Sequence, residues 1–215
     1  MIQLNINHLL YLLEAARWTI LLSLIAFVGG AIVGLPLAMM RVSKTTLLRG
    51  LAGAYIQIIQ GTPLLIVLFL SYFGLGILGY KLVPLVAAAI ALTLYAAAFL
   101  GEIWRGCIEA VPKTQWEASD CLGLNRVQQY AYVILPQAVR LAIPPTVGFM
   151  VQIVKNTSLA SVIGFVELAR AGQIVNNSTF EPFAIFAAVA AIYFVLCYPL
   201  SVAARRLERR VHVGR

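Results

Sequence analysis

Long segments without a charged residue constrain the fold of this chain more than any other feature. The 215-residue sequence is 61% hydrophobic and only 11% charged, whereas a soluble domain is about half apolar and about a quarter charged. A helix that crosses a membrane needs about 20 mostly apolar residues. The segments that meet this requirement are about 18–40, 51–73, 82–104, 137–157 and 183–204. The sequence therefore predicts an all-α integral membrane protein with five transmembrane helices.

The charge-free part of the fourth segment, between Arg140 and Lys155, is short, and the distribution of basic residues supports the assignment of a span there. The loop before it and the tail after residue 204 are both strongly basic, so an even number of crossings should separate them. Of the sixteen Lys and Arg residues, three at 41–49, four at 105–140 and five at 205–215 then share one side, which leaves four on the other. Because basic residues favour the cytoplasm, we expect an outside N-terminus, a cytoplasmic C-terminus and a cytoplasmic loop at about 106–136.

The sequence carries no catalytic or metal-binding pattern. No lysine follows a glycine-rich phosphate loop, and neither Gly-x-Ser-x-Gly nor His-Glu-x-x-His occurs. The three cysteines and two histidines are scattered, which supports neither a disulfide framework nor a zinc site. The net charge of +8 is explained by membrane orientation rather than by nucleic acid, because the basic residues cluster beside apolar spans. We expect one membrane domain, residues 1–215, that is not an enzyme.

Capping patterns in the polar loop predict a compact helix pair outside the lipid. Thr114 and Glu117 have the spacing of a capping box, and Gly123 suits the left-handed residue that ends a helix. Asn125, with a glutamine three residues later, suits the start of a second helix, and Pro136 discourages its continuation. A doubly capped pair should be rigid, and we expect a partner to hold it.

Motifs in and around this loop resemble the permease subunits of ATP-binding-cassette (ABC) importers. Glu117-Ala118-Ser119, Gly123 and Ile134-Leu135-Pro136 are similar to the Glu-Ala-Ala … Gly … Ile-x-Leu-Pro loop of that family. The flanks resemble the branch that imports polar amino acids or opines, through Gly61-Thr62-Pro63-Leu64-Leu65, Gly101-Glu102-Ile103-Trp104-Arg105-Gly106, Val111-Pro112-Lys113, Pro136-Gln137-Ala138 and Lys155-Asn156-Thr157-Ser158-Leu159. The similarity runs from about residue 16 to residue 210. Two residues depart from the family: Ser119 replaces a second alanine, a hydroxyl that a helix surface tolerates, and Asn156 stands where many members carry an aspartate.

The resemblance implies a type I importer permease with five helices that pairs with a second copy or a paralogue. Its cytoplasmic loop would dock on an ATPase subunit, which binds ATP and Mg²⁺, so the permease itself would bind no cofactor. An extracytoplasmic binding protein would deliver the amino acid, and the location would be the bacterial cytoplasmic membrane, with lipid and not nucleic acid around the chain. The residues expected in the ATPase-coupling loop are Thr114, Glu117, Ala118, Ser119, Gly123, Asn125, Ile134, Leu135 and Pro136.

Three polar features within the predicted spans are candidates for the substrate pathway. Gly61-Thr62-Pro63 interrupts the second apolar run, either as a packing kink or as backbone that lines a cavity. Lys155-Asn156-Thr157-Ser158 ends the fourth span, where the lysine either reaches lipid headgroups or meets a substrate carboxylate. Glu102 lies three residues before Arg105 on one helix face, either as a local ion pair or as a gate.

Two other classes of function remain open on the residues alone. A self-contained secondary transporter would need ion-coupling groups within the spans, which are nearly free of charge. An intramembrane enzyme would need a nucleophile and base or a metal motif.

Two local features complete the sequence expectations. Gly29, Gly30 and Gly34, together with Ala87, Ala88 and Ala89, permit close packing of helices in lipid. The segment 165–177 has apolar residues at helical spacing, which predicts a short helix at the outer membrane interface.

Overall fold

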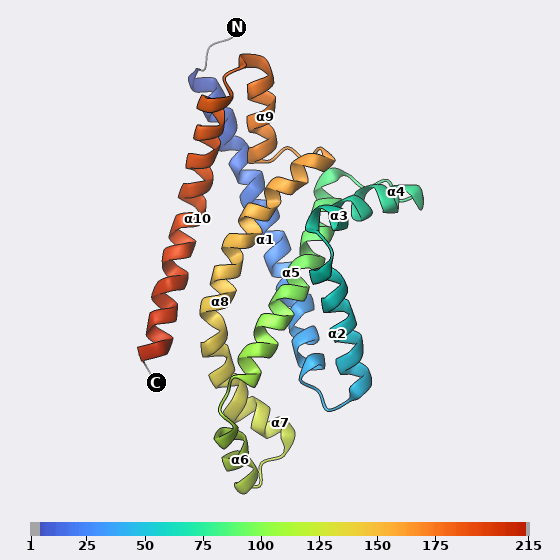
Figure 1. Ribbon diagram of the computed structural model, residues 1–215, viewed down its shortest axis with the longest axis vertical. Helices are drawn as coiled ribbons and strands as arrows, with labels where there is room; N and C mark the ends of the chain where they lie inside the picture. The colour runs from blue at the N-terminus through green and yellow to red at the C-terminus, as the bar shows by residue number, and fades with distance from the viewer. Residues whose placement is uncertain (1–4, 214–215) are drawn as a thin grey trace.

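The computed structural model describes residues 5–213, which form helices and no β-strand (Figure 1). The long helices are α1 (Ile6–Arg41), α5 (Pro84–Glu109), α8 (Leu135–Asn156) and α10 (Pro182–Val213). The shorter helices are α2 (Thr46–Gly61), α3 (Leu64–Phe69), α4 (Leu75–Ile77), α6 (Lys113–Cys121), α7 (Arg126–Gln128) and α9 (Leu168–Thr179). Wider π turns span Leu70–Gly74 and Gln129–Ile134, and a 3₁₀ helix spans Thr157–Ile163. The predicted all-α class is confirmed.

Four helical segments of the described range are long and apolar enough to cross a membrane. They are Ile6–Arg41, Pro84–Glu109, Arg126–Ile163 and Pro182–Arg210. The region of the predicted span 51–73 differs, because Thr46–Gly61 and Leu64–Ile77 meet at an angle of 102°. The count of spans is therefore four, or five if this bent pair forms one crossing.

The bend after α2 follows from Pro63. Proline has no amide hydrogen to donate, and it pushes the residue before it into an extended conformation; Thr62 accordingly has φ −106° and ψ 131°. The Thr62 amide donates to the Ile59 carbonyl (3.4 Å), and the Thr62 hydroxyl donates to the Ile58 carbonyl (2.7 Å). The carbonyls of Ile58 and Ile59 thus receive donors although the helix stops.

Small residues bring α1 and α5 into close contact. A Cβ atom added to Gly30 would lie 2.4 Å from the Cβ of Ala96. One added to Gly34 would lie 3.0 Å from the Ala97 carbonyl oxygen, and one added to Gly101 would lie 3.2 Å from the Gly34 carbonyl oxygen. The predicted close packing by the glycines is therefore present, and their partners on α5 include Ala96, Ala97 and Gly101.

Pro136 does not end the second helix of the polar loop, so that expectation was wrong. Residues 126–156 are helical throughout, as α7, the π turn Gln129–Ile134 and α8 in succession. A proline ring clashes with the carbonyl four residues earlier in a regular α-helix. The π turn ends two residues before Pro136 and changes the hydrogen-bond register from i→i−4 to i→i−5. Pro136 therefore lies in the first turn of α8, where a proline is tolerated.

The two ends of the molecule carry different helix clusters (Figure 1). At one end α9 packs against the start of α1 and the start of α10, with Leu12, Leu168, Val175 and Ile185 in a shared hydrophobic cluster. The predicted short helix at 165–177 is thus present, as Leu168–Thr179. At the opposite end lie α6 and α7. The polar helix pair is separated from α9 by the length of the bundle.

Candidate functional site

The start of α6 differs from the prediction. We expected Thr114 and Glu117 to form a capping box, but α6 begins at Lys113, its N-cap is Pro112, and no side chain caps it. An N-cap residue needs an extended backbone, and Pro112 supplies it with φ −53° and ψ 138°. Thr114 already has helical geometry, so its hydroxyl is not placed to cap the helix. Thr114, Glu117 and Ala118 are exposed on α6 instead.

The turn between α6 and α7 agrees with the prediction. Gly123 has φ +70°, the left-handed region in which glycine avoids a steric clash. The Leu124 amide donates to the Ser119 carbonyl (3.2 Å), and the Gly123 amide donates to the Asp120 carbonyl (2.9 Å). This pair of bonds is the Schellman motif that ends a helix at a left-handed residue. The predicted helix stop at Gly123 is confirmed.

The start of α7 also agrees with the prediction. The Gln128 amide donates to Asn125 Oδ1 (3.0 Å), and the Asn125 amide donates to Gln128 Oε1 (2.9 Å). Both bonds of a capping box are therefore made. The second helix of the pair begins where the sequence predicted.

Contacts across the turn hold the two helices together, and sequence reasoning missed them. Gln129 is 1% exposed, and its amide nitrogen donates both to Asp120 Oδ1 and to the Leu124 carbonyl (3.1 Å). Trp116 and Tyr130 meet edge to face, with ring centroids 5.2 Å apart. Asp120 and Gln129 are nine residues apart, so neither helical periodicity nor a local motif pairs them. The pair is rigid through these tertiary contacts as well as through its caps.

The base of the pair is a small hydrophobic cluster. Ile134 is fully buried and packs with Ile108, Val111 and Ala138, which come from α5, the loop after it and α8. Leu135 is half-buried beside them, whereas Pro136 is exposed. Ser119 is only 1% exposed, and its hydroxyl donates to the Trp116 carbonyl (2.7 Å), so the expectation that it lies on the helix surface was wrong.

Three large apolar side chains are exposed on this polar pair. Leu122 is 77% exposed, Val127 is 78% exposed and Tyr132 is 75% exposed. Leu122 and Val127 flank the turn at Gly123, beyond the apolar part of the helices, so lipid does not explain them. Exposed apolar groups that cluster outside a membrane are typical of a protein contact surface. Sequence reasoning did not single them out, because it followed the polar residues of the loop.

The three candidates for the substrate pathway form two groups. The first two candidates are linked through a hydrophobic cluster, and Glu102 is separate from them. The break at Gly61-Thr62-Pro63 leads into α3, which shares a hydrophobic cluster with the 3₁₀ helix after Asn156 through Leu64, Ala160 and Ile163. The segment after Asn156 uses its hydroxyls locally: Thr157 donates to the Val154 carbonyl (2.8 Å) and Ser158 donates to the Lys155 carbonyl (2.7 Å). Lys155 is exposed in the last turn of α8, and the described residues include no ion-pair partner for it.

Asn156 and Glu102 differ in how their polar atoms are paired. Asn156 Oδ1 accepts from Gln152 Nε2 (3.2 Å), but its own Nδ2 is buried without a partner among the described residues. Glu102 Oε1 accepts from Arg105 Nε (2.9 Å), and Glu102 Oε2 lies 3.7 Å from Arg41 Nε. The predicted local ion pair is confirmed and extends to α1, since Arg41 is the last residue of that helix. No hydrogen bond or ion pair within residues 5–213 joins Glu102 to the two other candidates.

A buried carboxylate at the opposite end was also missed. Glu167 is fully buried and accepts hydrogen bonds from Tyr193 Oη (2.7 Å), Thr19 Oγ1 (3.3 Å) and the amides of Ala169 (3.0 Å) and Arg170 (2.9 Å). It caps α9 and ties that helix to α1 and α10. An acid directly before a helical pattern is a weak capping signal, but its long-range partners depend on the fold.

Comparison with known proteins decides which family has this arrangement. The sequence profile of the family described as "Binding-protein-dependent transport system inner membrane component" matches residues 26–213. The chain belongs to this family. The family description agrees with the predicted inner-membrane location, and the predicted resemblance to ABC importer permeases is confirmed.

Individual relatives of this inner membrane component cover nearly its whole length. A probable amino-acid ABC transporter permease of Bacillus subtilis is 34% identical over 97% of this chain and 92% of the relative. The glutamine transport system permease of Escherichia coli is 34% identical over 94% of this chain and 93% of the relative. A solved structure described as an amino acid ABC transporter with histidines superposes with a TM-score of 0.91 at 31% identity, over 97% of this chain and 100% of that chain. A methionine ABC transporter superposes with a TM-score of 0.82 at 20% identity and supports the fold alone.

Proposed function

We propose that the chain is the membrane-spanning permease of an ABC importer for a polar amino acid. The observation that carries the proposal is the locked helix pair α6–α7, which exposes Leu122 and Val127 beyond the spans. The family membership and the amino-acid transport named for the relatives support it. ATP and Mg²⁺ bind to a separate ATPase subunit, so this chain is a transport subunit and not an enzyme. An extracytoplasmic binding protein delivers the substrate.

The proposed topology places the N-terminus outside and the C-terminus in the cytoplasm. The bent pair α2–α3 then serves as one of five crossings, which gives a single type I permease domain over residues 1–215. The positive-inside rule supports this orientation. The coupling loop at about 106–136 faces the cytoplasm, and a second copy or a paralogue completes the pathway.

The helix pair transmits motion because it is stiff and continuous with a span. When ATP closes the ATPase dimer, α6–α7 moves as a rigid body. The helix from Arg126 to Asn156 has no break, so a displacement of the pair acts directly on α8. The Gln129–Asp120 contact makes α6 follow the same motion. Thr114, Glu117 and Ala118 supply exposed positions of the contact surface, whereas Ser119 and Ile134 hold it in shape.

The substrate pathway is proposed at the outer half of the molecule. Lys155 is an exposed cation that suits a substrate carboxylate, and Asn156 offers a buried amide donor without a partner. Thr157, Ser158 and the break at Gly61-Thr62-Pro63 shape the backbone near it. Glu102 is proposed as a gate that its arginine partners hold closed. An opine or another amino-acid derivative is the alternative substrate, because it shares the same charged groups.

Cysteine labelling tests the orientation. Cys121 is exposed on α6, whereas Cys107 is half-buried and Cys197 is buried. A membrane-impermeant maleimide is expected to label Cys121 in inverted vesicles and not in right-side-out vesicles, and Cys121→Ser should remove the signal. Labelling from the outer side only would contradict the topology.

Association with the ATPase tests the coupling surface. The chain is co-purified with the ATPase subunit encoded next to it, and Leu122→Glu is expected to abolish co-purification because a charge enters an apolar contact. Ile6→Glu is the matched control, since Ile6 is 66% exposed at the opposite end of the molecule. If Leu122→Glu associates and transports like the unchanged chain, α6–α7 is not the coupling element.

A further inference from the structure

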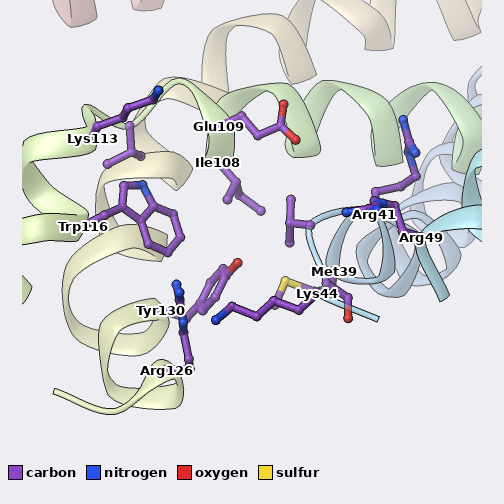
Figure 2. A pocket seen from close by; sticks show the side chains of 13 residues that line it. Met39, Arg41, Lys44, Arg49, Ile108, Glu109, Lys113, Trp116, Arg126 and Tyr130 are labelled. Carbon is purple, nitrogen blue, oxygen red and sulfur yellow. The ribbon is translucent and has the colours of Figure 1, made fainter. Parts of the chain in front are cut away.

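A cavity of about 750 Å³ opens beside the coupling helices (Figure 2). Its wall combines the end of α1, the turn to α2, the end of α5, and residues of α6, α7 and the π turn. Five of the thirteen lining side chains are basic, namely Arg41, Lys44, Arg49, Lys113 and Arg126. Glu109 is the one acid among them. The cavity therefore carries a strong excess of positive charge.

Most of this charge is not neutralised within the described residues. Arg41 lies near Glu102, and the carboxylate of Glu109 pairs with Arg105. Lys44, Arg49, Lys113 and Arg126 are exposed and make no ion pair in residues 5–213. Cations held around one cavity repel one another unless an anion lies between them. The arrangement favours an anionic ligand.

Most of the remaining wall is apolar or aromatic. Ile108 and Val111 are nearly fully buried at its base, and Met39, Trp116 and Tyr130 are half-buried around it. In Figure 2 the Lys44 side chain extends toward Tyr130 and Arg126, and the Trp116 ring faces the open space. A small inorganic anion would gain nothing from contact with this apolar surface. A molecule with a phosphate beside an apolar part fits both components.

The cavity also lies at the level where spans end. Arg41 is the last residue of α1, Glu109 is the last residue of α5, and Arg49 lies in the first turn of α2. Basic pockets between helices at the cytoplasmic side of a membrane are suited to anionic lipid headgroups. We propose that the cavity binds the phosphate headgroup of an acidic phospholipid of the cytoplasmic leaflet. This inference rests on the proposed topology, which puts α6–α7 in the cytoplasm.

Such a lipid bridges two parts of the chain. Lys44 lies in the turn between α1 and α2 and Arg49 lies at the start of α2, whereas Lys113 and Arg126 belong to the coupling helices. A headgroup between them neutralises both sets and ties the coupling helices to the ends of α1 and α2. The cavity is therefore expected to make the position of α6–α7 depend on acidic lipid.

Native mass spectrometry of the detergent-purified chain, titrated with phosphatidylglycerol, tests the proposal. One phosphatidylglycerol per chain is expected to bind tightly, and phosphatidylcholine should not displace it. The triple variant Lys44→Gln/Arg49→Gln/Arg126→Gln should bind about a hundredfold more weakly, since each basic residue contributes about fivefold. Single substitutions, about fivefold each, confirm the result should the triple variant fail to fold. The matched control is Arg205→Gln/Arg206→Gln/Arg209→Gln, which removes the same charge from α10 and should change binding less than about threefold.

Three results would overturn the assignment. An equal loss in the control variant would mean diffuse attraction to a basic protein. Displacement of the lipid by an equal concentration of inorganic phosphate would mean a free-anion site. Displacement by the ATPase subunit would mean that the cavity belongs to a protein interface. Because the lipid titration itself is made without the ATPase subunit and orientation is measured at Cys121, failure of the proposed function is distinguishable from failure of this site.

Discussion

The closest approach between α1 and α5 makes Gly30→Ala a sensitive test of the packing. The added Cβ would lie 2.4 Å from the Cβ of Ala96 and 3.0 Å from its carbonyl carbon. Non-bonded carbons sit at about 3.5–4.0 Å, so the helices must separate by roughly 1.1–1.6 Å. Neither neighbouring atom is the end of a flexible side chain that could turn away.

The expected loss of stability is about 2 kcal/mol. Overpacking of a well-packed core destabilises by about 1–3 kcal/mol, and this rigid contact belongs at the upper end of that range. Replacing a helical glycine by alanine returns about 0.5–1 kcal/mol. The loss of stability should lower the temperature at which the buried Cys197 reacts with a thiol-reactive dye. The measurement is made in a Cys121→Ser background.

Two further variants control this test. Gly50→Ala has no heavy atom within 4 Å of the new Cβ, so it should be neutral or slightly stabilising. Adding Ala96→Gly to Gly30→Ala removes the nearest atom and should restore part of the stability. If the Gly30→Ala and Gly50→Ala variants unfold at the same temperature, the close approach of the two helices is refuted.

Four other substitutions have defined outcomes. Asn125→Ala should lower stability by about 1 kcal/mol through loss of the cap, whereas Thr114→Ala should leave thermal unfolding unchanged, and equal effects would contradict the cap assignment. Glu167→Ala leaves buried donors without an acceptor, each at about 1–3 kcal/mol, so α9 should show faster hydrogen exchange than in the unchanged chain; unaltered protection would refute the role of this carboxylate. Glu102→Gln should reduce amino-acid uptake without loss of ATPase association, and full uptake would reject the gate.

Local signals in the sequence predicted the features that depend on few residues. The segments without charged residues located the apolar helices. Asn125 was recognised as a helix start and Gly123 as a helix stop, because a cap acts within three or four residues. The same kind of signal failed at Thr114, because Pro112 offered an extended N-cap two residues earlier. Thr114 and Pro112 were both possible N-cap residues, and sequence spacing alone does not show which of them caps α6.

Features that join distant segments could not be predicted in this way. Thr19 and Glu167 are 148 residues apart, and Asp120 meets Gln129 only after the Gly123 turn has formed. The partners of Gly30 depend on how far α5 slides along α1, which hydrophobic pattern does not determine. Buried polar groups such as Glu167 also look like loop residues in a sequence, because their acceptors and donors are supplied by other helices.

The π turn at Gln129–Ile134 sets the rotational phase between the coupling helices and α8. A π turn holds one residue more than an α-helical turn, and each residue of an α-helix accounts for about 100° of rotation and about 1.5 Å of rise. Without that extra residue, the side chains of α7 would be rotated by about 100° around the helix axis relative to those of α8. Gln129 would then face away from Asp120, and Leu122 and Val127 would present themselves to a different side of the molecule. The one extra residue of the π turn thus determines the side of the molecule to which the contact surface faces.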